Sequence, residues 1–518
     1  MCADAVTNLL SDDFDGELIV GLIAAVGTET TQVISLLEEQ LSLCGYETDL
    51  IKISRDVIAE LCVEDKLDEE PSSRINSYMS AGNNIRKLAT EKKEDNIAGG
   101  DAVLAFGAAA RIFDQRAKDA KGKTLPHEKK AFIVDSLKRP EEVEALRRIY
   151  PQGFVLIGVH ADKERRKKYL TDTLDMNTES ATKLMDRDAD ERVEEHGQRV
   201  NKTFHLADFF VQITENRDSL RGDIRRMVEL WFGHPYHTPT FEEFAMFFAY
   251  SSALRSADLS RQVGAVIVRD KEILSTGANE CPKSGGGQYW SERNKEQLID
   301  DVEHGRDYKL GCDSNKKEQN TIIEEIVAKG IQTGFDEEKL RRLLSESKIK
   351  DLTEYGRVVH AEMEALLSCA RRGIETTDAE LFCTTFPCHN CAKHIIDAGI
   401  KRVVFVEPYE KSKALEFHSD SIVFRSGQSV SDDVEKVIFQ PFVGIGPRRF
   451  YDLFSMSLSS GYEVLRKDDK GETIKWDKDE ALRSRLRLQM KPSSYLELEA
   501  VASKRFKEIL DSFNKQRD

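Results

Sequence analysis

The first half of the chain alternates short apolar runs with charged stretches of helical periodicity. Continuous apolar runs at 17–25, 131–134 and 154–159 have the pattern of strands buried on both faces, and a further strand-like piece lies at 48–53. The clearest helical stretch is 31–43, where apolar residues recur at helical spacing. Strands that alternate with helices predict a parallel α/β domain.

A highly charged stretch at 171–202 interrupts this alternation and predicts a solvated helix or a lid. A last apolar strand at 207–213 and an amphipathic helix at 220–232 follow it. The segment 234–239, His-Pro-Tyr-His-Thr-Pro, then breaks the pattern because each proline disfavours a regular element. We place a domain boundary there.

A second α/β pattern begins with an amphipathic helix at 241–256 and a hairpin, whose strands are predicted at 263–268 and 273–276. A polar insertion that opens with three glycines runs from about 285 to 356. The remaining pattern predicts two further helices and two further strands, namely helix 360–371, strand 380–384, helix 388–398 and strand 402–406.

The predicted fold class is therefore α/β, with three segments. These are a parallel α/β domain at 1–236, a second α/β domain at 237–420, and an extension at 421–518 that we expect to pack on the second domain. The extension contains a strand-like piece at 437–443 and a final helix at 495–513.

Composition narrows the class of protein. A chain of 518 residues is too long for one core, and the net charge of −16 disfavours wholesale binding to nucleic acid. Nine scattered cysteines predict reduced thiols rather than a disulfide framework. The first ten residues show no signal peptide, and the sequence contains no apolar run of bilayer-spanning length. We expect a cytoplasmic protein without a membrane partner.

Four residues form the strongest chemical pattern in the sequence. His360 and Glu362 stand in an H-x-E arrangement, and Cys388 and Cys391 form a P-C-x-x-C at a predicted helix start. The two thiolates and one imidazole are three zinc ligands, which leave one tetrahedral position open for water. Zn²⁺ would lower the pKa of that water to about 7, and Glu362 is placed to shuttle protons. The pattern is typical of zinc-dependent deaminases.

The alternative is a closed structural zinc site. Such a site needs a fourth ligand with the correct spacing. His389 lies inside the C-x-x-C and points poorly, and Cys383 belongs to the preceding strand. Within the insertion, His304 and Cys312 are candidates for a second metal, an interpretation that we do not favour.

Residues 240–410 resemble the deoxycytidylate deaminase family. Four stretches carry the resemblance: 255–265 (RSADLSRQVGA), 277–282 (GANECP), 360–365 (HAEMEA) and 386–392 (FPCHNCA). The sequence departs from the family pattern at Ala278, Glu280 and Glu364. A Glu364 in place of the family asparagine would alter contacts with the base or the sugar, which leaves the identity of the nucleotide open.

The same resemblance implies roles for five further positions. Asn279 would hold the sugar or base, Ser256, Arg255 and Arg261 would lie near the phosphates, and Tyr409 would lie near the base or sugar. Both arginines are equally compatible with ordinary surface charges.

In the first domain, the turn after the apolar run at 17–25 occupies the place of a phosphate-binding loop. Gly21, Gly27 and Thr28 are its candidate nucleotide-binding residues, although the glycine spacing is one residue too long. Thr28 and Glu29 replace the lysine and hydroxyl residue of a working P-loop, and an acid there repels phosphate. The segment resembles a degenerate P-loop nucleoside-kinase-like domain. We expect no phosphotransfer and leave nucleotide binding open.

Other residues of this domain fit the same resemblance. Asp135, at the end of an apolar strand, resembles a Walker-B-type acid. Three arginines are possible lid cations, which we favour as surface charges: Arg147, Arg165 and Arg166.

The whole arrangement resembles the bacterial antiphage deoxycytidylate deaminases. That resemblance implies removal of dCTP and dCMP during phage infection, a multimer of hexameric type, and restraint by an inhibitory small RNA. The competing interpretations are a deaminase of cytosine or adenine in RNA or single-stranded DNA, a nucleotide sensor without catalysis, and an active kinase. The acidic net charge disfavours the polynucleotide deaminase. The intact Glu362 disfavours the sensor, and the missing P-loop lysine disfavours the kinase.

Overall fold

The computed structural model describes residues 16–59, 70–91, 100–189, 197–352, 354–408, 412–425, 435–459, 461–476 and 485–515. The chain forms two compact units. Unit 1 comprises Met1–Thr240 and Val443–Asp518, and unit 2 comprises Phe241–Phe442. A search of the described residues for a helix with the length and apolar character of a membrane span finds none.

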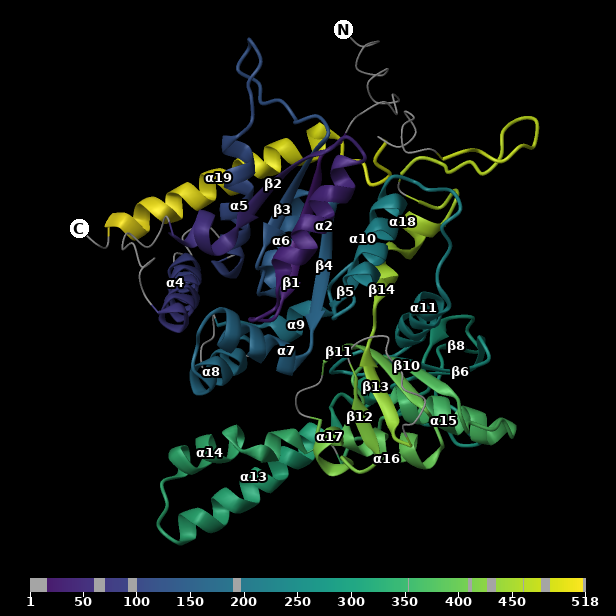
Figure 1. Ribbon diagram of the computed structural model, residues 1–518. Helices are drawn as coiled ribbons and strands as arrows, with labels where there is room; N and C mark the ends of the chain where they lie inside the picture. The colour runs from purple at the N-terminus through teal and green to yellow at the C-terminus, as the bar shows by residue number, and fades with distance from the viewer. Residues whose placement is uncertain are drawn as a thin grey trace. The chain divides into compact units, whose positions relative to one another are not determined.

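Unit 1 is built on a six-stranded sheet with the order β14-β5-β4-β1-β3-β2 (Figure 1). Its strands are β1 (Leu18–Ala24), β2 (Glu47–Lys52), β3 (Lys130–Asp135), β4 (Phe154–Ala161), β5 (Phe209–Ile213) and β14 (Gly444–Ile445). All neighbours are parallel except β14, which runs antiparallel to β5. The side chains of β1 are all buried, as expected for a strand covered on both faces. The predicted α/β class is confirmed.

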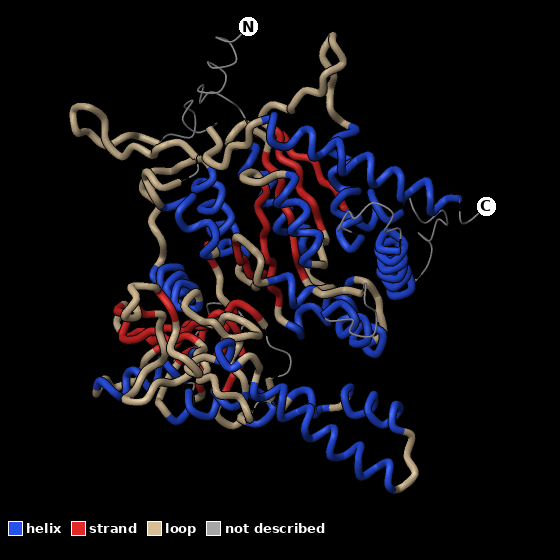
Figure 2. Tube along the Cα trace, turned by 180° about the vertical axis from the view of Figure 1, so that it is seen from behind, coloured by secondary structure: helices blue, strands red, loops and turns tan. Residues whose placement is uncertain are grey.

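Helices cover both faces of this sheet. On one face, α2 (Thr30–Ser42) and α10 (Arg217–Trp231) share a core with alternate residues of β1, β3, β4 and β5. Figure 2 shows the strands of this sheet as adjacent red segments of the backbone tube, among blue helices. The other described α-helices of this unit are α4 (Pro71–Glu91), α5 (Val103–Asp114), α6 (Pro140–Ile149), α7 (Lys163–Lys168), α8 (Thr178–Ala189), α9 (Val200–Phe204), α18 (Phe450–Phe454) and α19 (Pro492–Lys515).

The charged stretch expected to be a solvated helix or lid contains α8, and α8 is not merely solvated. Its residues Ala181, Leu184 and Met185 are buried in a cluster with Met79 and Leu170. The apolar side of the helix supplies this small core, while Glu179, Lys183 and Asp186 are exposed.

The C-terminal extension departs from the prediction. Its first part, up to Phe442, belongs to unit 2, but Val443–Asp518 belongs to unit 1. There, β14 pairs with β5, and α19 packs along α5 (Figure 1). The expectation that the whole extension packs on the second domain is therefore wrong.

A buried charge network explains this placement. Arg116 forms ion pairs with Glu17 and with Glu499 of α19, and all three side chains are fully buried. The hydroxyl of Tyr150 donates a hydrogen bond of 2.7 Å to Glu499. A buried carboxylate needs such partners, and these lie in unit 1.

Unit 2 contains a six-stranded mixed sheet with the order β12-β13-β11-β10-β6-β7. The strands are β6 (Gly264–Arg269), β7 (Glu272–Ala278), β10 (Glu380–Thr385), β11 (Arg402–Glu407), β12 (Ile422–Phe424) and β13 (Val437–Pro441). β6 and β7 form the predicted hairpin, which turns at Asp270 and Lys271, both with positive φ. Four helices accompany the sheet: α11 (Phe241–Ala253), α15 (Ala361–Arg372), α16 (His389–Asp397) and α17 (Ala414–Phe417).

One glycine of β7 brings α15 close to the sheet. A Cβ atom at Gly277 would lie 2.1 Å from the carbonyl oxygen of Ala361, the first residue of α15. Any larger residue would therefore push the helix away. Because His360 and Glu362 flank Ala361, this close approach fixes how near they lie to the sheet.

The insertion forms a helical hairpin with short elements at its base. Helices α13 (Ser314–Gln332) and α14 (Glu337–Glu346) pack against each other. The base contains α12 (Asp307–Leu310) and the two-stranded sheet of β8 (Glu292–Arg293) and β9 (Ile299–Asp300).

Candidate functional site

Three potential metal ligands meet where two helices of unit 2 begin. His360 is the N-cap of α15, and Cys388 is the N-cap of α16, which carries Cys391 in its first turn. The His360 Nδ1 atom lies 3.4 Å from the Cys388 sulfur and 3.3 Å from the Cys391 sulfur. Tetrahedral zinc with ordinary Zn–S and Zn–N bonds places such atoms about 3.5 Å apart. The residues present therefore fit a zinc ion.

The helix starts also suit the charge of these ligands. The Cys388 sulfur accepts a 3.4 Å hydrogen bond from the Cys391 amide. Hydrogen bonds from Cys391 and His360, acting against burial, lower the pKa of the Cys388 thiol to about 4. A thiolate is the form that binds metal, and a helix N-terminus stabilises it.

Glu362 lies in the first turn of α15, two residues after His360. Its side chain is buried, with 4% of the residue exposed. Burial raises the pKa of its carboxyl above the ordinary value, against the opposing charge of His360. A carboxyl group whose neutral form is favoured in this way is suited to accept a proton, as a proton shuttle must.

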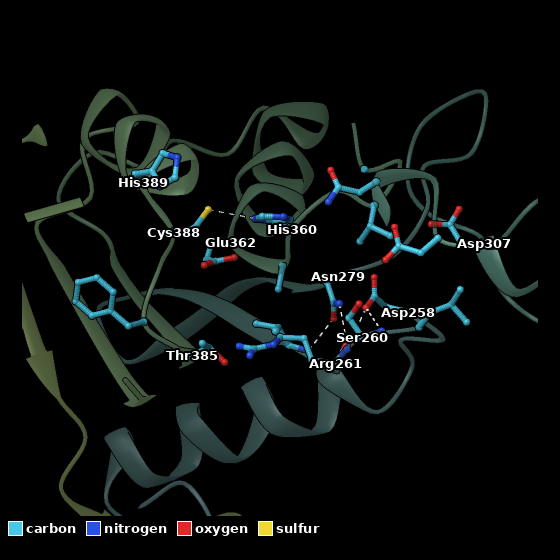
Figure 3. A pocket seen from close by; sticks show the side chains of 18 residues that line it. Asp258, Ser260, Arg261, Asn279, Asp307, His360, Glu362, Thr385, Cys388 and His389 are labelled. Carbon is cyan, nitrogen blue, oxygen red and sulfur yellow. Dashed lines mark hydrogen bonds between the residues drawn. The ribbon is translucent and has the colours of Figure 1, made fainter. Parts of the chain in front are cut away.

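These residues line a cavity of about 380 Å³ in unit 2. Figure 3 shows His360, Cys388 and Glu362 together on one side of it, with Asn279, Asp258 and Arg261 across the space. The lining comprises Asp258, Leu259, Ser260, Arg261, Val263, Asn279, Asp307, Asp313, Asn315, Gly356, Val358, His360, Ala361, Glu362, Thr385, Phe386, Cys388 and His389. A cavity of this size accommodates a small organic ligand.

Asn279 reaches this cavity, but its amide also supports the backbone. Its Oδ1 accepts a 2.7 Å hydrogen bond from the Val263 amide, and its Nδ2 donates one of 2.8 Å to the Arg261 carbonyl. The residue is buried, so these bonds hold the 261–263 loop at the rim of the cavity. Asn279 is thus first a positioning residue in this structure, with one amide hydrogen left for a ligand.

Of the three residues expected near the phosphates, Arg261 lines the cavity and the other two do not. The Arg261 guanidinium lies 3.7 Å from Glu407. Ser256 accepts a 3.2 Å hydrogen bond from the Asp258 amide, which shapes the loop. Arg255 donates to the Tyr289 carbonyl at 3.0 Å and stacks 3.6 Å above the ring of Trp290.

Glu364 also lies outside the cavity lining. Its carboxylate forms a 2.6 Å ion pair with Arg371 on the same helix. The carboxylate that departs from the family pattern is therefore engaged by an arginine of its own helix. Tyr409 lies outside the described residues.

Sequence reasoning missed one wall of the cavity. Asp307, Asp313 and Asn315 come from the base of the insertion. Asp313 also caps α13 through the Lys316 amide, and Asp307 pairs with Arg357 at 2.9 Å. The signal available in the sequence was the insertion itself, since long insertions commonly carry functional residues.

The other proposed metal pair of the insertion does not assemble. Cys312 is exposed, and His304 lies 3.7 Å from Glu303. In the described part of the chain, neither belongs to a group of three ligands close enough for one ion.

The P-loop-like turn of unit 1 is arranged differently from a phosphate-binding loop. Gly21 lies inside β1, where a Cβ would meet Leu137 and Phe154 at 2.8 Å, so it is a packing residue. Gly27 has a φ of +84°, and a Cβ there would lie 2.7 Å from the Arg166 carbonyl oxygen. The Thr28 hydroxyl is buried and has no hydrogen-bond partner among the described residues.

The protein's own carboxylate occupies this turn. The Val26 amide donates a 2.7 Å hydrogen bond to Asp188, which is fully buried. Lys138 lies 2.9 Å from the same carboxylate and donates to the Ala24 carbonyl at 2.8 Å. The Val26 amide, in a turn that would cradle a phosphate in a P-loop, therefore binds an internal anion here.

The remaining candidates of unit 1 also have internal partners. Arg165 pairs with Glu29 at 2.7 Å, Arg166 donates to the Val26 carbonyl at 3.3 Å, and Arg147 lies 3.1 Å from Asp208. Asp135 is buried, which raises the pKa of its carboxyl.

Comparison with known proteins agrees with the geometry of unit 2. The family model of the cytidine and deoxycytidylate deaminase zinc-binding region matches residues 239–407. The deoxycytidylate deaminase of Enterobacteria phage T4 is 31% identical over 169 residues, which are 32% of this chain and 77% of that protein. The chain belongs to the deoxycytidylate deaminase family. Unit 2 is therefore called the deaminase unit below.

Two further relatives show the same extent of similarity. The deoxycytidylate deaminase of Enterobacteria phage T2 is 30% identical and covers 32% of this chain and 79% of its own length. The mouse deoxycytidylate deaminase is 28% identical and covers 32% of this chain and 63% of its own length. Among solved structures, the cyanophage S-TIM5 dCMP deaminase covers 40% of this chain and 100% of its own, with 18% identity and a TM-score of 0.22.

Proposed function

We propose that this protein hydrolyses the exocyclic amine of deoxycytidine nucleotides, converting dCMP, dCTP or both to dUMP or dUTP and ammonia. The observation that carries the proposal is the meeting of His360, Cys388 and Cys391 beside the buried Glu362 at one cavity. Three nitrogen and sulfur ligands with an adjacent carboxyl are the equipment of hydrolytic deamination.

His360, Cys388 and Cys391 would hold Zn²⁺, which when bound lowers the pKa of a water molecule and so supplies a nucleophile at neutral pH. Glu362 then moves protons. Its carboxylate would take one proton from the attacking water and deliver it to the ring nitrogen, and would then carry the second proton, from the hydroxyl now on the ring carbon, to the leaving amine. Because Glu362 is buried, its proton is not lost to bulk solvent between these steps.

The charge of the cavity bears on the number of phosphates. Among the described lining residues, Arg261 is the single arginine or lysine, whereas Asp258, Asp307 and Asp313 are acidic. A monophosphate needs fewer cations than a triphosphate, which would meet these carboxylates unless a divalent cation accompanied it. These charges support dCMP, or dCTP bound with Mg²⁺.

The decisive experiment measures ammonia release from dCMP, dCTP, CTP, cytidine and a cytosine-containing single-stranded DNA, each with and without Mg²⁺. We expect turnover of dCMP or of Mg²⁺-dependent dCTP, and loss of that turnover in Glu362→Gln. Deamination of single-stranded DNA with no free nucleotide consumed would reject the proposal in favour of a polynucleotide deaminase.

We also propose that this activity depletes deoxycytidine nucleotides during phage infection, in a multimer of hexameric type restrained by an inhibitory small RNA. The support is the resemblance of the chain to bacterial antiphage deaminases. Plaque counts on bacteria that express the wild-type protein or Glu362→Gln test the first point, with protection expected only from the wild type. Equal plaque counts would reject it. Light scattering and sequencing of copurified RNA test the others.

A further inference from the structure

A second group of metal-binding side chains lies in unit 1, where helix α10 ends. Single ligand atoms of Glu229, His234 and His237 all lie within 4.8 Å of one another. We propose that these three residues form a second metal site, which binds a divalent transition-metal ion such as Zn²⁺. Neither the deaminase reaction nor the family motif uses these residues.

The local sequence explains how the first two ligands meet. α10 ends in a Schellman motif, in which Gly233 has a φ of +69° and its amide donates to the Leu230 carbonyl at 3.1 Å. The His234 amide donates to the Glu229 carbonyl at 2.9 Å. This turn folds the chain back over the last turn of the helix and brings the His234 ring beside the Glu229 side chain.

The prolines of the following segment return a second imidazole to the same point. The His237 Nε2 atom lies 2.6 Å from Glu229 Oε2. The rings of His234 and His237 stack with centroids 4.0 Å apart. Nitrogen and oxygen atoms that bind one tetrahedral zinc lie about 3.4 Å apart. Small side-chain rotations would therefore separate His237 and Glu229 enough for an ion to take the place of their hydrogen bond.

Two of the three ligand residues, His234 and Glu229, have pKa values shifted in the direction that metal binding requires. Burial, assisted by the charge of His237, lowers the pKa of His234. Burial opposes the charge of Glu229, but hydrogen bonds from His237 and Arg225 outweigh it and lower the pKa of the carboxyl to about 2. The site also lies at the C-terminal, negative end of the α10 dipole.

Further contacts orient the ligands as a metal site requires. Arg225 donates a 2.8 Å hydrogen bond to Glu229 Oε1, which leaves Oε2 to bind the ion. The Trp476 ring lies 4.5 Å from the His234 ring and shields one side. The His237 side chain is 25% exposed, which gives an ion a path of entry. Two imidazoles and a carboxylate suit Zn²⁺ and its neighbours better than Ca²⁺ or Mg²⁺.

The position of the site indicates what the ion does. It lies in the last residues of unit 1 before the chain enters unit 2 at Phe241. The connecting segment is held by Arg466, which donates to the Pro235 carbonyl at 2.8 Å, and by the Tyr236 hydroxyl, which donates to the Ile474 carbonyl at 2.8 Å. An ion bound by residues before and within this segment fastens it to the end of α10. The three protein ligands leave a fourth position for water, and the ion would hold this segment in place.

The test is metal analysis of the full-length protein after equilibration with Zn²⁺ and removal of loosely bound ion. We expect about two equivalents of zinc per chain in the wild type and about one in His237→Ala or in Cys388→Ser/Cys391→Ser. The matched control is His304→Ala, which removes an exposed histidine near an acid and should retain about two. Combining His237→Ala with the cysteine changes should leave essentially none.

A second readout guards against misfolded variants and separates the two sites. Co²⁺ bound in the Cys388→Ser/Cys391→Ser background should show visible bands without thiolate charge transfer, because its ligands are nitrogen and oxygen. His234→Asn and Glu229→Gln, which preserve side-chain shape, should abolish those bands. The proposal is overturned if the cysteine variant binds no metal, or if its metal persists in His237→Ala. A failure of the deaminase proposal alone would leave these results unchanged.

Discussion

The deaminase cavity and the P-loop-like turn of unit 1 both lie at the start of a helix, yet one is open and the other is filled. At the cavity, His360 and Cys388 direct ligand atoms from two helix N-caps toward a space of about 380 Å³. At the turn, the Asp188 carboxylate accepts a hydrogen bond from the Val26 amide. The comparison teaches that a helix N-terminus becomes a ligand site only when the chain leaves that position vacant.

The largest expected effect is on turnover at the deaminase cavity. Glu362→Gln removes the proton shuttle while it preserves the shape of the side chain, so turnover should fall by about 10²- to 10⁴-fold. Steady-state kinetics measure this fall. The matched control is Glu364→Gln on the same helix, whose side chain pairs with Arg371 outside the cavity and should leave turnover near wild type. A similar loss in both variants would place the effect in the helix rather than in Glu362.

The next effect is on the stability of unit 1. Glu499→Ala leaves Arg116 with one buried carboxylate partner where it had two, and should lower the free energy of unfolding by about 3–5 kcal/mol. Urea unfolding followed by tryptophan fluorescence reports it, since Trp231 and Trp476 lie in unit 1 and Trp290 lies in unit 2. Because Lys507 pairs with Asp114 at an exposed position, Lys507→Ala is the control and should change stability by about 1 kcal/mol or less. Equal effects would mean that the network does not fasten α19.

A smaller effect tests whether the turn can be opened. Asp188→Asn removes the charge that pairs with Lys138 and accepts from Val26, and should cost about 1–3 kcal/mol of stability. We expect no ATP hydrolysis, because Thr28 and Glu29 stand where a P-loop has its lysine and hydroxyl residue. Nucleotide hydrolysis gained in this variant would show that the turn retains a working phosphate site.

The smallest effect concerns the cavity rim. Asn279→Ala loses two hydrogen bonds to the 261–263 backbone, so KM should rise more than kcat falls, with a stability loss of about 1–3 kcal/mol. Kinetics and thermal unfolding of the same preparation separate the two. If kcat falls and KM is unchanged, Asn279 acts on the reacting base and is more than a positioning residue.

Prediction from the sequence succeeded where a motif was local and failed where contacts were distant. His360, Glu362, Cys388 and Cys391 lie in the first turns of two helices, so short spacing rules suffice to group them. Arg255 and Glu364 also stand in motif positions, yet their side chains turn to Trp290 and Arg371. The motif could not show these partners, because Trp290 lies on another segment and Arg371 lies about two turns further along the same helix.

The amino-acid sequence by itself determined the alternation of strands and helices, the candidate metal ligands and the family, because each depends on residue type at short spacing. Only the tertiary structure decided three other features. It returned Val443–Asp518 to unit 1, brought Asp307 and Asp313 of the insertion to the cavity, and put Asp188 into the P-loop-like turn. Each joins residues far apart in the chain, and such contacts are selected by burial of charge and apolar surface in the folded unit.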